Sequence, residues 1–161
     1  MSELLSDYCI RTGSGLDRAL LVKFMQRTYQ ELFPDQDFSH LAQTVEQFLS
    51  KETPLWWVEF IGTETVEKVA CLWVGNAVDQ VRGDRHTHVF LLYVIPQHRR
   101  RGIGKALMSY MENWARMRGD RQVGLQVFQA NQPALNLYSQ LGYQTQSFWM
   151  VKSLHLEKLA E

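Results

Sequence analysis

Residues 91–108 read LLYVIPQHRRRGIGKALM, and this stretch decides how the rest of the chain is interpreted. An apolar run ends at Pro96, three consecutive arginines follow, and Gly102 and Gly104 introduce a helical pattern. The first turn of a helix carries unpaired N–H groups and the positive end of the helix dipole, so it attracts anions. Glycine lets the backbone approach a phosphate closely, and arginine donates charge-assisted hydrogen bonds to phosphate oxygens. The stretch therefore predicts a loop that binds phosphate or pyrophosphate, placed between a strand and a helix.

Three other ligands for this loop are disfavoured by its spacing. A dinucleotide fingerprint needs a third glycine where the sequence has Leu107. A Walker A loop needs glycine at Arg99 and serine or threonine at Ala106. A nucleic-acid contact would favour a longer basic face interleaved with exposed aromatic residues, and the following helix supplies few further bases.

The remaining elements are predicted from hydrophobic periodicity and from the positions of proline and glycine. Strands are expected at Tyr8–Arg11, Leu55–Phe60, Lys68–Gly75, His88–Ile95 and Gln122–Phe128, with one or two more between Tyr143 and Leu154. Helices are expected at Leu16–Phe33, Leu41–Leu49, Gly104–Arg118 and Asn131–Leu141. This order predicts an α/β fold in one domain over residues 1–161, with a mixed, mostly antiparallel sheet and helices on both faces.

The composition is that of a globular protein. Hydrophobic residues make up 45% of the 161 residues and charged residues 21%. We find no apolar run of the roughly 20 residues that a membrane-spanning helix needs, and no secretion signal at the N-terminus. Cys9 and Cys71 are the two cysteines and form no paired motif, so a reducing cytoplasm is expected. Cys71 lies in an apolar run, where a buried structural role is expected rather than a nucleophile.

Charge is unevenly distributed along a chain whose formal net charge is zero. Residues 29–67 hold eight acids and one base, whereas residues 95–121 hold seven bases and two acids. This asymmetry would suit one anionic and one cationic ligand, although charge that only keeps the protein in solution explains it equally well.

Two motifs in this order resemble the GCN5-related N-acetyltransferase (GNAT) superfamily. The run from Arg99 to Gly104 resembles the family's Gln/Arg-x-x-Gly-x-Gly/Ala signature, and NQPALNLYSQLGY at 131–143 resembles its Asn-x-x-Ala-x-x-x-Tyr…Gly-Phe/Tyr element. The resemblance covers about residues 87–143. It implies a GNAT-like fold that takes acetyl-coenzyme A as co-substrate and an amine as acceptor. From the residues themselves we expect no metal, no nucleic-acid partner and no membrane partner, and a homodimer stays open.

The resemblance also assigns roles to residues. Tyr138 would be the acid that protonates the departing thiolate, since a phenol is protonated at neutral pH. A backbone amide between Leu92 and Val94 would polarise the thioester carbonyl, where this strand splays from the next. The full expected cofactor-binding set is Leu92, Tyr93, Val94, Arg99, Arg100, Arg101, Gly102, Ile103, Gly104, Lys105, Asn131 and Tyr138.

The general base is less well defined. Gln126 stands where some relatives carry a glutamate, and glutamine cannot accept a proton usefully at neutral pH. Other members of the family carry a glutamate at the position of His88, and our hypothesis is that His88 is the general base. Glu59 and a chain of water molecules are the alternatives. His86 and His88 would share a strand face, but no third metal ligand accompanies them.

The sequence also leaves open which amine is the acceptor and whether the protein is catalytically active. The segment FPDQDFSH would border the acceptor site, and its Asp35 and Asp37 would favour a cationic amine such as a polyamine, a lysine side chain or an aminoglycoside. Trp56, Trp57 and Trp73 would line an apolar wall or, more simply, pack in the core. The rival to an enzyme is a catalytically silent acyl-coenzyme A sensor that kept the binding loop.

Overall fold

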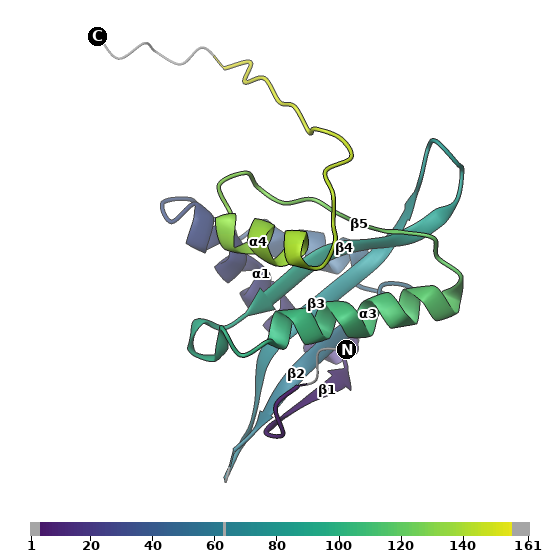
Figure 1. The fold of residues 1–161 in the computed structure, drawn as a ribbon. Helices are drawn as coiled ribbons and strands as arrows, with labels where there is room; N and C mark the ends of the chain where they lie inside the picture. Colours follow the sequence, from purple (N-terminus) through teal and green to yellow (C-terminus); the bar gives the residue numbers. More distant parts are fainter. Residues whose placement is uncertain (1–3, 63, 156–161) are drawn as a thin grey trace.

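The protein folds around one five-stranded sheet flanked by helices (Figure 1). The computed structural model describes residues 4–62 and 64–155. The strands are β1 (Tyr8–Thr12), β2 (Leu55–Ile61), β3 (Val66–Val78), β4 (Arg85–Val94) and β5 (Val123–Leu125). The α-helices are α1 (Arg18–Leu32), α2 (Leu41–Phe48), α3 (Ile103–Arg118) and α4 (Gln132–Gln140), and two 3-10 turns, η1 (Gly15–Asp17) and η2 (Pro96–His98), precede α1 and α3.

The sheet is mixed and mostly antiparallel, as the sequence predicts. Its strand order is β1-β2-β3-β4-β5, and each neighbouring pair from β1 to β4 is antiparallel. β5 is parallel to β4 because α3 carries the chain back across the sheet before β5 begins.

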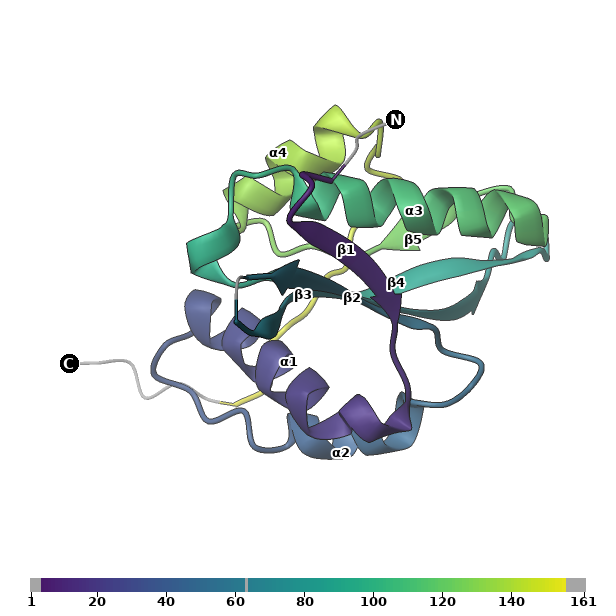
Figure 2. The ribbon, with the colours of Figure 1, turned by 90° about the horizontal axis from the view of Figure 1, so that it is seen from below.

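Helices cover both faces of the sheet (Figure 2). On one face, Phe24 of α1 packs its ring edge against Trp57 of β2 and Tyr93 of β4. On the other, Trp56 of β2 packs against Tyr110 and Trp114 of α3. Neighbouring tryptophans point to opposite faces because side chains alternate along a strand.

The buried residues confirm the core roles expected for several side chains. Trp56, Trp57 and Trp73 are each at most 4% exposed, so all three serve the core and not a wall of the site. Cys71 is fully buried, and burial raises the pKa of its thiol far above the ordinary value, which removes it as a nucleophile.

Three expectations from the sequence differ from the structure. Leu16 lies in η1 and is 97% exposed, so the apolar face of the first helix begins later than its spacing indicates. The strand expected at Gln122–Phe128 is limited to Val123–Leu125, because its pairing with β4 ends there. The strands expected between Tyr143 and Leu154 are absent from the described chain, which instead runs exposed and away from the body (Figure 1).

Within the described residues, no helix is both long and apolar enough to cross a membrane.

Candidate functional site

β4 and β5 diverge, and their divergence opens one edge of β4. Their ladder holds three pairs and ends where Val89 meets Leu125, although β4 continues to Val94. The amide of Ile95, directly after β4, donates to the carbonyl of Val69 of β3 at 2.9 Å. Because backbone direction alternates along a strand, the N–H groups of Leu92 and Val94 point the other way, towards the edge that β5 has left. The splay expected from the resemblance is therefore present.

The start of α3 lies directly beyond the end of this open edge. Gly102 precedes the helix with a left-handed φ of 74°, and no side chain caps the helix. Ala106 makes the first helical hydrogen bond, to Gly102, at 3.0 Å. The N–H groups at positions 103–105 consequently have no helical partner, which is the arrangement that binds an anion.

The arginine triplet divides into different roles. Arg99 is bound to other parts of the chain: its Nε donates to the carbonyl of Val94 at 2.8 Å and its Nη2 to Glu31 at 2.6 Å. Its guanidinium also lies 5.5 Å from the ring centre of Tyr93, whose hydroxyl donates to the same Glu31 at 3.1 Å. Arg99 therefore ties the loop to α1 and β4, and its side chain is not free to meet a ligand.

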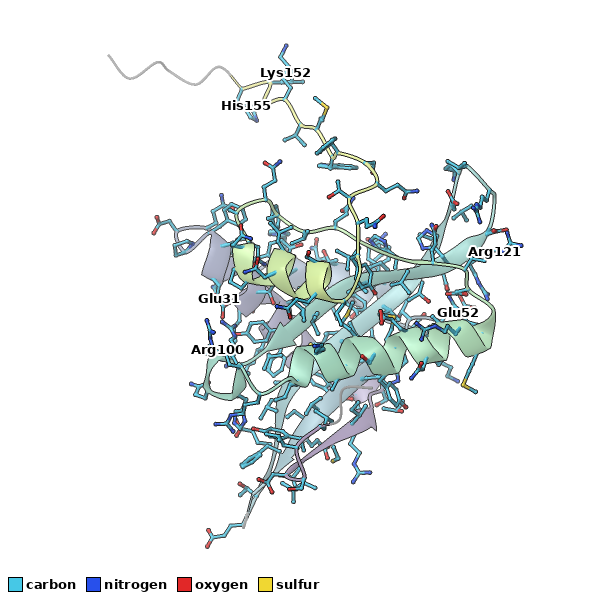
Figure 3. The ribbon with its side chains drawn as sticks, viewed as in Figure 1. Glu31, Glu52, Arg100, Arg121, Lys152 and His155 are labelled. Atoms are coloured by element: carbon cyan, nitrogen blue, oxygen red, sulfur yellow. The ribbon has the colours of Figure 1, made fainter. Side chains whose placement is uncertain are left out.

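Arg101 is also engaged, whereas two other cations are free. Arg101 donates to the hydroxyl of Tyr8 at 2.5 Å, and that oxygen lies 2.7 Å from Nδ1 of the buried His98. Arg100, at the tip of the loop in Figure 3, and Lys105 are exposed and have no hydrogen bond or ion pair within the described part of the chain. These two side chains are the ones available to phosphate oxygens.

α4 closes the same end of the site. A methyl group at Gly104 would lie 3.4 Å from Leu137 of α4 and 3.9 Å from Leu92 of β4, so three elements meet at the start of α3. Asn131 caps α4 by accepting a hydrogen bond from the amide of Ala134 at 3.3 Å, as its position predicts.

Tyr138 follows Leu137 and is partly buried. Burial raises the pKa of its phenol to about 12, so the group stays protonated at neutral pH. Its ring packs against Tyr143, but its hydroxyl makes no hydrogen bond with the described residues. Tyr143, in contrast, donates to Glu112 at 3.0 Å. Of this neighbouring pair, only the Tyr138 hydroxyl is left to serve a ligand.

The base candidates lie in three different places. His88 is half-buried on β4, opposite Gly124 of β5, and burial together with the neighbouring His86 lowers its pKa. Gln126 is exposed, just beyond β5. Glu59 lies on β2, two strands from β4, within 3.4 Å of Arg11. Only His88 and Gln126 therefore border the divergence of β4 and β5. His86 is buried, and its Nδ1 lies 2.9 Å from the backbone carbonyl of Thr87. Among the described residues, no three His, Cys, Asp or Glu side chains are grouped so that they could hold a metal ion.

An aromatic cluster that the sequence did not predict joins the end of α1 to the chain after β5. Phe128, after β5, packs its ring edge against Tyr29 and Phe33 at the end of α1, at 6.0 and 5.3 Å between ring centres. The loop that follows α1 carries the exposed Asp35 and Asp37. Glu31 was also missed, because no local pattern links it to a loop 68 residues away.

Comparisons with known proteins agree with this geometry. A profile described as the Acetyltransferase (GNAT) family matches residues 20–143. N-acetyltransferase family 8 member 3 of Mus musculus is 32% identical over 104 residues, which cover 65% of this chain and 45% of that protein. The chain thus spans about half the length of the curated relatives it matches.

Solved structures show the same fold. A possible acetyltransferase from Clostridium difficile 630 superposes with a TM-score of 0.72 at 20% identity, covering 96% of this chain and all of that one. A "predicted acetyltransferase with acetyl-CoA" from Clostridium acetobutylicum has a TM-score of 0.72 at 18% identity, covering 93% of this chain and 99% of its own. The chain belongs to the acetyltransferase (GNAT) family.

Proposed function

We propose that this protein transfers the acetyl group of acetyl-coenzyme A directly to a primary amine. The observation that carries the proposal is the open edge of β4, on which Leu92 lies next to Gly104 at the uncapped start of α3. Coenzyme A has the matching shape, since an amide-containing arm can pair with a strand edge while its pyrophosphate meets a helix N-terminus. The pyrophosphate would be held by the amides at positions 103–105 and by Arg100 and Lys105.

The reaction requires the amine nitrogen to attack the thioester carbon while the carbon–sulfur bond breaks. Negative charge on the carbonyl oxygen would be stabilised by the N–H of Leu92 or Val94, which already points to the open edge. Tyr138 would donate its proton to the departing sulfur, because its raised pKa keeps it protonated and its hydroxyl is free among the described residues. The proton lost by the amine passes to a base.

His88 is the base that we propose. Its lowered pKa keeps the ring neutral, and so able to accept a proton, at neutral pH. It lies four residues before Leu92, which corresponds to about 13 Å along a strand. His88 therefore acts through bridging water and not by direct contact.

The acceptor would be a cationic amine entering from the end of α1. Asp35 and Asp37 are exposed on the adjoining loop, and the ring of Phe128 brings that loop next to the chain leaving β5. Acids at the mouth of a site attract an ammonium group and raise its local concentration.

A two-stage experiment tests the proposal. Acetyl-coenzyme A at about 100 times its dissociation constant should raise the melting temperature by about 5–10 °C, since ligand binding stabilises the folded state. Free thiol is then measured with a panel of polyamines, lysine peptides and aminoglycosides, and release on at least one amine is expected.

The alternatives give different results in the same experiment. Stabilisation without thiol release on any amine would favour the acyl-coenzyme A sensor. No stabilisation at all would contradict both coenzyme A hypotheses. Binding to nucleic acid that falls steeply with salt and is unaffected by coenzyme A would restore the nucleic-acid hypothesis.

A further inference from the structure

Glu31 lies at the end of α1 in a position that is unfavourable for the helix itself. It belongs to the last turn, where a carboxylate meets the negative end of the helix dipole, and that turn contains no basic residue. Within the described part of the chain, both of its hydrogen bonds come from outside α1: the Tyr93 hydroxyl donates at 3.1 Å and the Arg99 guanidinium at 2.6 Å. Figure 3 shows Glu31 next to the loop that carries Arg100. A charge that disfavours its own helix and binds two other elements indicates a role in tertiary positioning.

Arg99 extends the contact from Glu31 to the edge of β4. Its Nε donates to the carbonyl of Val94 at 2.8 Å. In an antiparallel strand the N–H and C=O of one residue point to the same side, and the amide of the next residue, Ile95, bonds to β3. The Val94 carbonyl therefore lies on the same open edge as the N–H groups of Leu92 and Val94. Arg99 occupies the hydrogen-bond acceptor at the end of that edge.

The occupied carbonyl restricts how an extended ligand can pair with β4. With Val94 engaged, a ligand N–H can still reach the carbonyl of Leu92, which lies beyond the last β5 pair at Val89. A ligand that slipped by one pairing step, to Val94, would move two residues along the strand, which corresponds to about 7 Å. Its thioester would then lie farther from His88, the proposed base. The bond of Arg99 to Val94 disfavours this slipped register.

We propose that Glu31 is a positioning residue: it holds Arg99 on the carbonyl of Val94 and so sets the register in which acetyl-coenzyme A pairs with β4. This inference rests on the proposed function. Arg99 also opens the loop that leads to α3, so the same contact fixes the strand edge relative to the amides at 103–105. The thioester end and the pyrophosphate end of the coenzyme are thereby placed relative to one another. The ring of Tyr93, 5.5 Å from the guanidinium, supports this arrangement.

The expected effect on catalysis is much larger than the effect on folding. The side chains of Glu31 and Arg99 are each 41% exposed, and an exposed ion pair contributes little to stability. In contrast, a misplacement of a bound substrate by about 1 Å can cost about 100-fold in rate. Removal of the Glu31 charge should therefore lower turnover while the protein stays folded.

The first test compares two thioesters in Glu31→Gln. Acetyl-pantetheine has the thioester and the amide-containing arm of acetyl-coenzyme A but no pyrophosphate, so a displaced loop cannot pull it out of place. With acetyl-coenzyme A, kcat/KM should fall about 10- to 100-fold. With acetyl-pantetheine it should fall no more than about twofold, since two registers of similar energy leave about half of the arm productively bound. Glu46→Gln, which breaks the exposed ion pair with Arg18, is the matched control and should keep the wild-type value with both thioesters.

The second test uses acetyl-coenzyme A alone. The double variant Glu31→Arg with Arg99→Glu restores an ion pair between α1 and the loop, but a carboxylate cannot donate to the carbonyl of Val94. Its melting temperature should lie within about 3 °C of the wild-type value. Its kcat/KM should nevertheless stay at least about tenfold below the wild-type value, because the register is still not set.

The outcomes separate this inference from the proposed function. Equal losses with both thioesters, no loss in Glu31→Gln, or wild-type kcat/KM in the exchanged pair would each overturn the positioning role and leave the proposed function intact. A wild-type protein that releases no thiol from acetyl-coenzyme A on any amine would overturn the proposed function, and this inference with it.

Discussion

Arg100 holds a left-handed backbone conformation, with φ of 62°, that non-glycine residues rarely adopt. Backbone strain that persists at a loop tip often accompanies a functional requirement. The side chain is also free of partners among the described residues, unlike Arg99 and Arg101. Arg100 is therefore the arginine of the triplet whose guanidinium we assign to the ligand.

Arg100→Gly and Arg100→Ala should separate backbone strain from ligand binding. Both remove a charge-assisted hydrogen bond, so we expect each to weaken coenzyme A binding about tenfold. Glycine relieves the left-handed strain and alanine retains it, so the glycine variant should melt at the higher temperature of the two. Calorimetric titration and thermal melts measure the two effects. Wild-type affinity in both variants would remove Arg100 from the cradle.

Tyr138→Phe should lower kcat at least about 100-fold, since it removes the proposed proton donor without changing the ring. The melting temperature and the KM for acetyl-coenzyme A should change little, because the hydroxyl has no protein partner among the described residues. Tyr110→Phe is the control: Tyr110 is 44% exposed on α3 and should show wild-type turnover. An active Tyr138→Phe enzyme would contradict the role.

His88→Ala tests the base through the pH profile of kcat/KM. Burial and the nearby His86 lower the pKa of His88, so the wild-type rate should fall only below about pH 6.5, as the ring becomes protonated. This acid limb should disappear in His88→Ala together with a loss of rate, whereas His40→Ala should keep it. An unchanged profile would remove His88.

Among the elements, the start of α3 meets α4 and β4 at Gly104, which has no side chain of its own. A Cβ there would make ordinary contacts with Leu137 and Leu92, so Gly104→Ala should fold normally. A leucine side chain would extend between α3, α4 and β4, where the coenzyme is expected. Gly104→Leu should abolish stabilisation by acetyl-coenzyme A, whereas Arg100→Ala should only weaken it. A larger loss of binding in Arg100→Ala than in Gly104→Leu would show that side-chain charge, and not close approach of the backbone, dominates the binding of the ligand.

The elements also show where local pattern is sufficient. α3 agrees with its prediction to one residue because its apolar spacing, its leading glycines and the closing Gly119 all act within the helix. β5 and the segment after Tyr143 have apolar patterns of strand type, but a strand forms only where a neighbouring strand is present to pair with it. Pairing is a property of two segments distant in sequence, and the pattern of one of them does not contain it.

At the scale of the whole molecule, Asp120 joins the end of α3 to the sheet. Its side chain is 2% exposed and accepts hydrogen bonds from Arg118 at 2.7 Å and from the amide of Thr87 at 2.8 Å. Burial alone would raise the pKa of Asp120, but the hydrogen bonds from Arg118 and Thr87 outweigh it and lower the pKa.

Asp120→Asn should therefore lower the free energy of unfolding by about 2 kcal/mol at pH 7. A carboxyl group with a lowered folded pKa stabilises the fold above its ordinary pKa of about 4, and this stabilisation is lost as the pH falls through the folded value. Wild type and variant should thus converge in denaturant unfolding as the pH drops below about 4. Glu46→Gln is the control, since the exposed ion pair of Glu46 with Arg18 should contribute under about 1 kcal/mol. A constant difference at all pH values would contradict the assignment.

The family, the order of the elements as far as α4 and the loop before α3 follow from the sequence alone, because each depends on residues that lie close together in the chain. The tertiary structure decided which cations of that loop are free, since Glu31 and Tyr8 bind Arg99 and Arg101 from distant elements. It also decided where β5 leaves β4 and that the apolar segment 148–154 has no partner within its own described chain. These outcomes depend on long-range pairing, in which a backbone group or side chain finds its partner only after the sheet has formed.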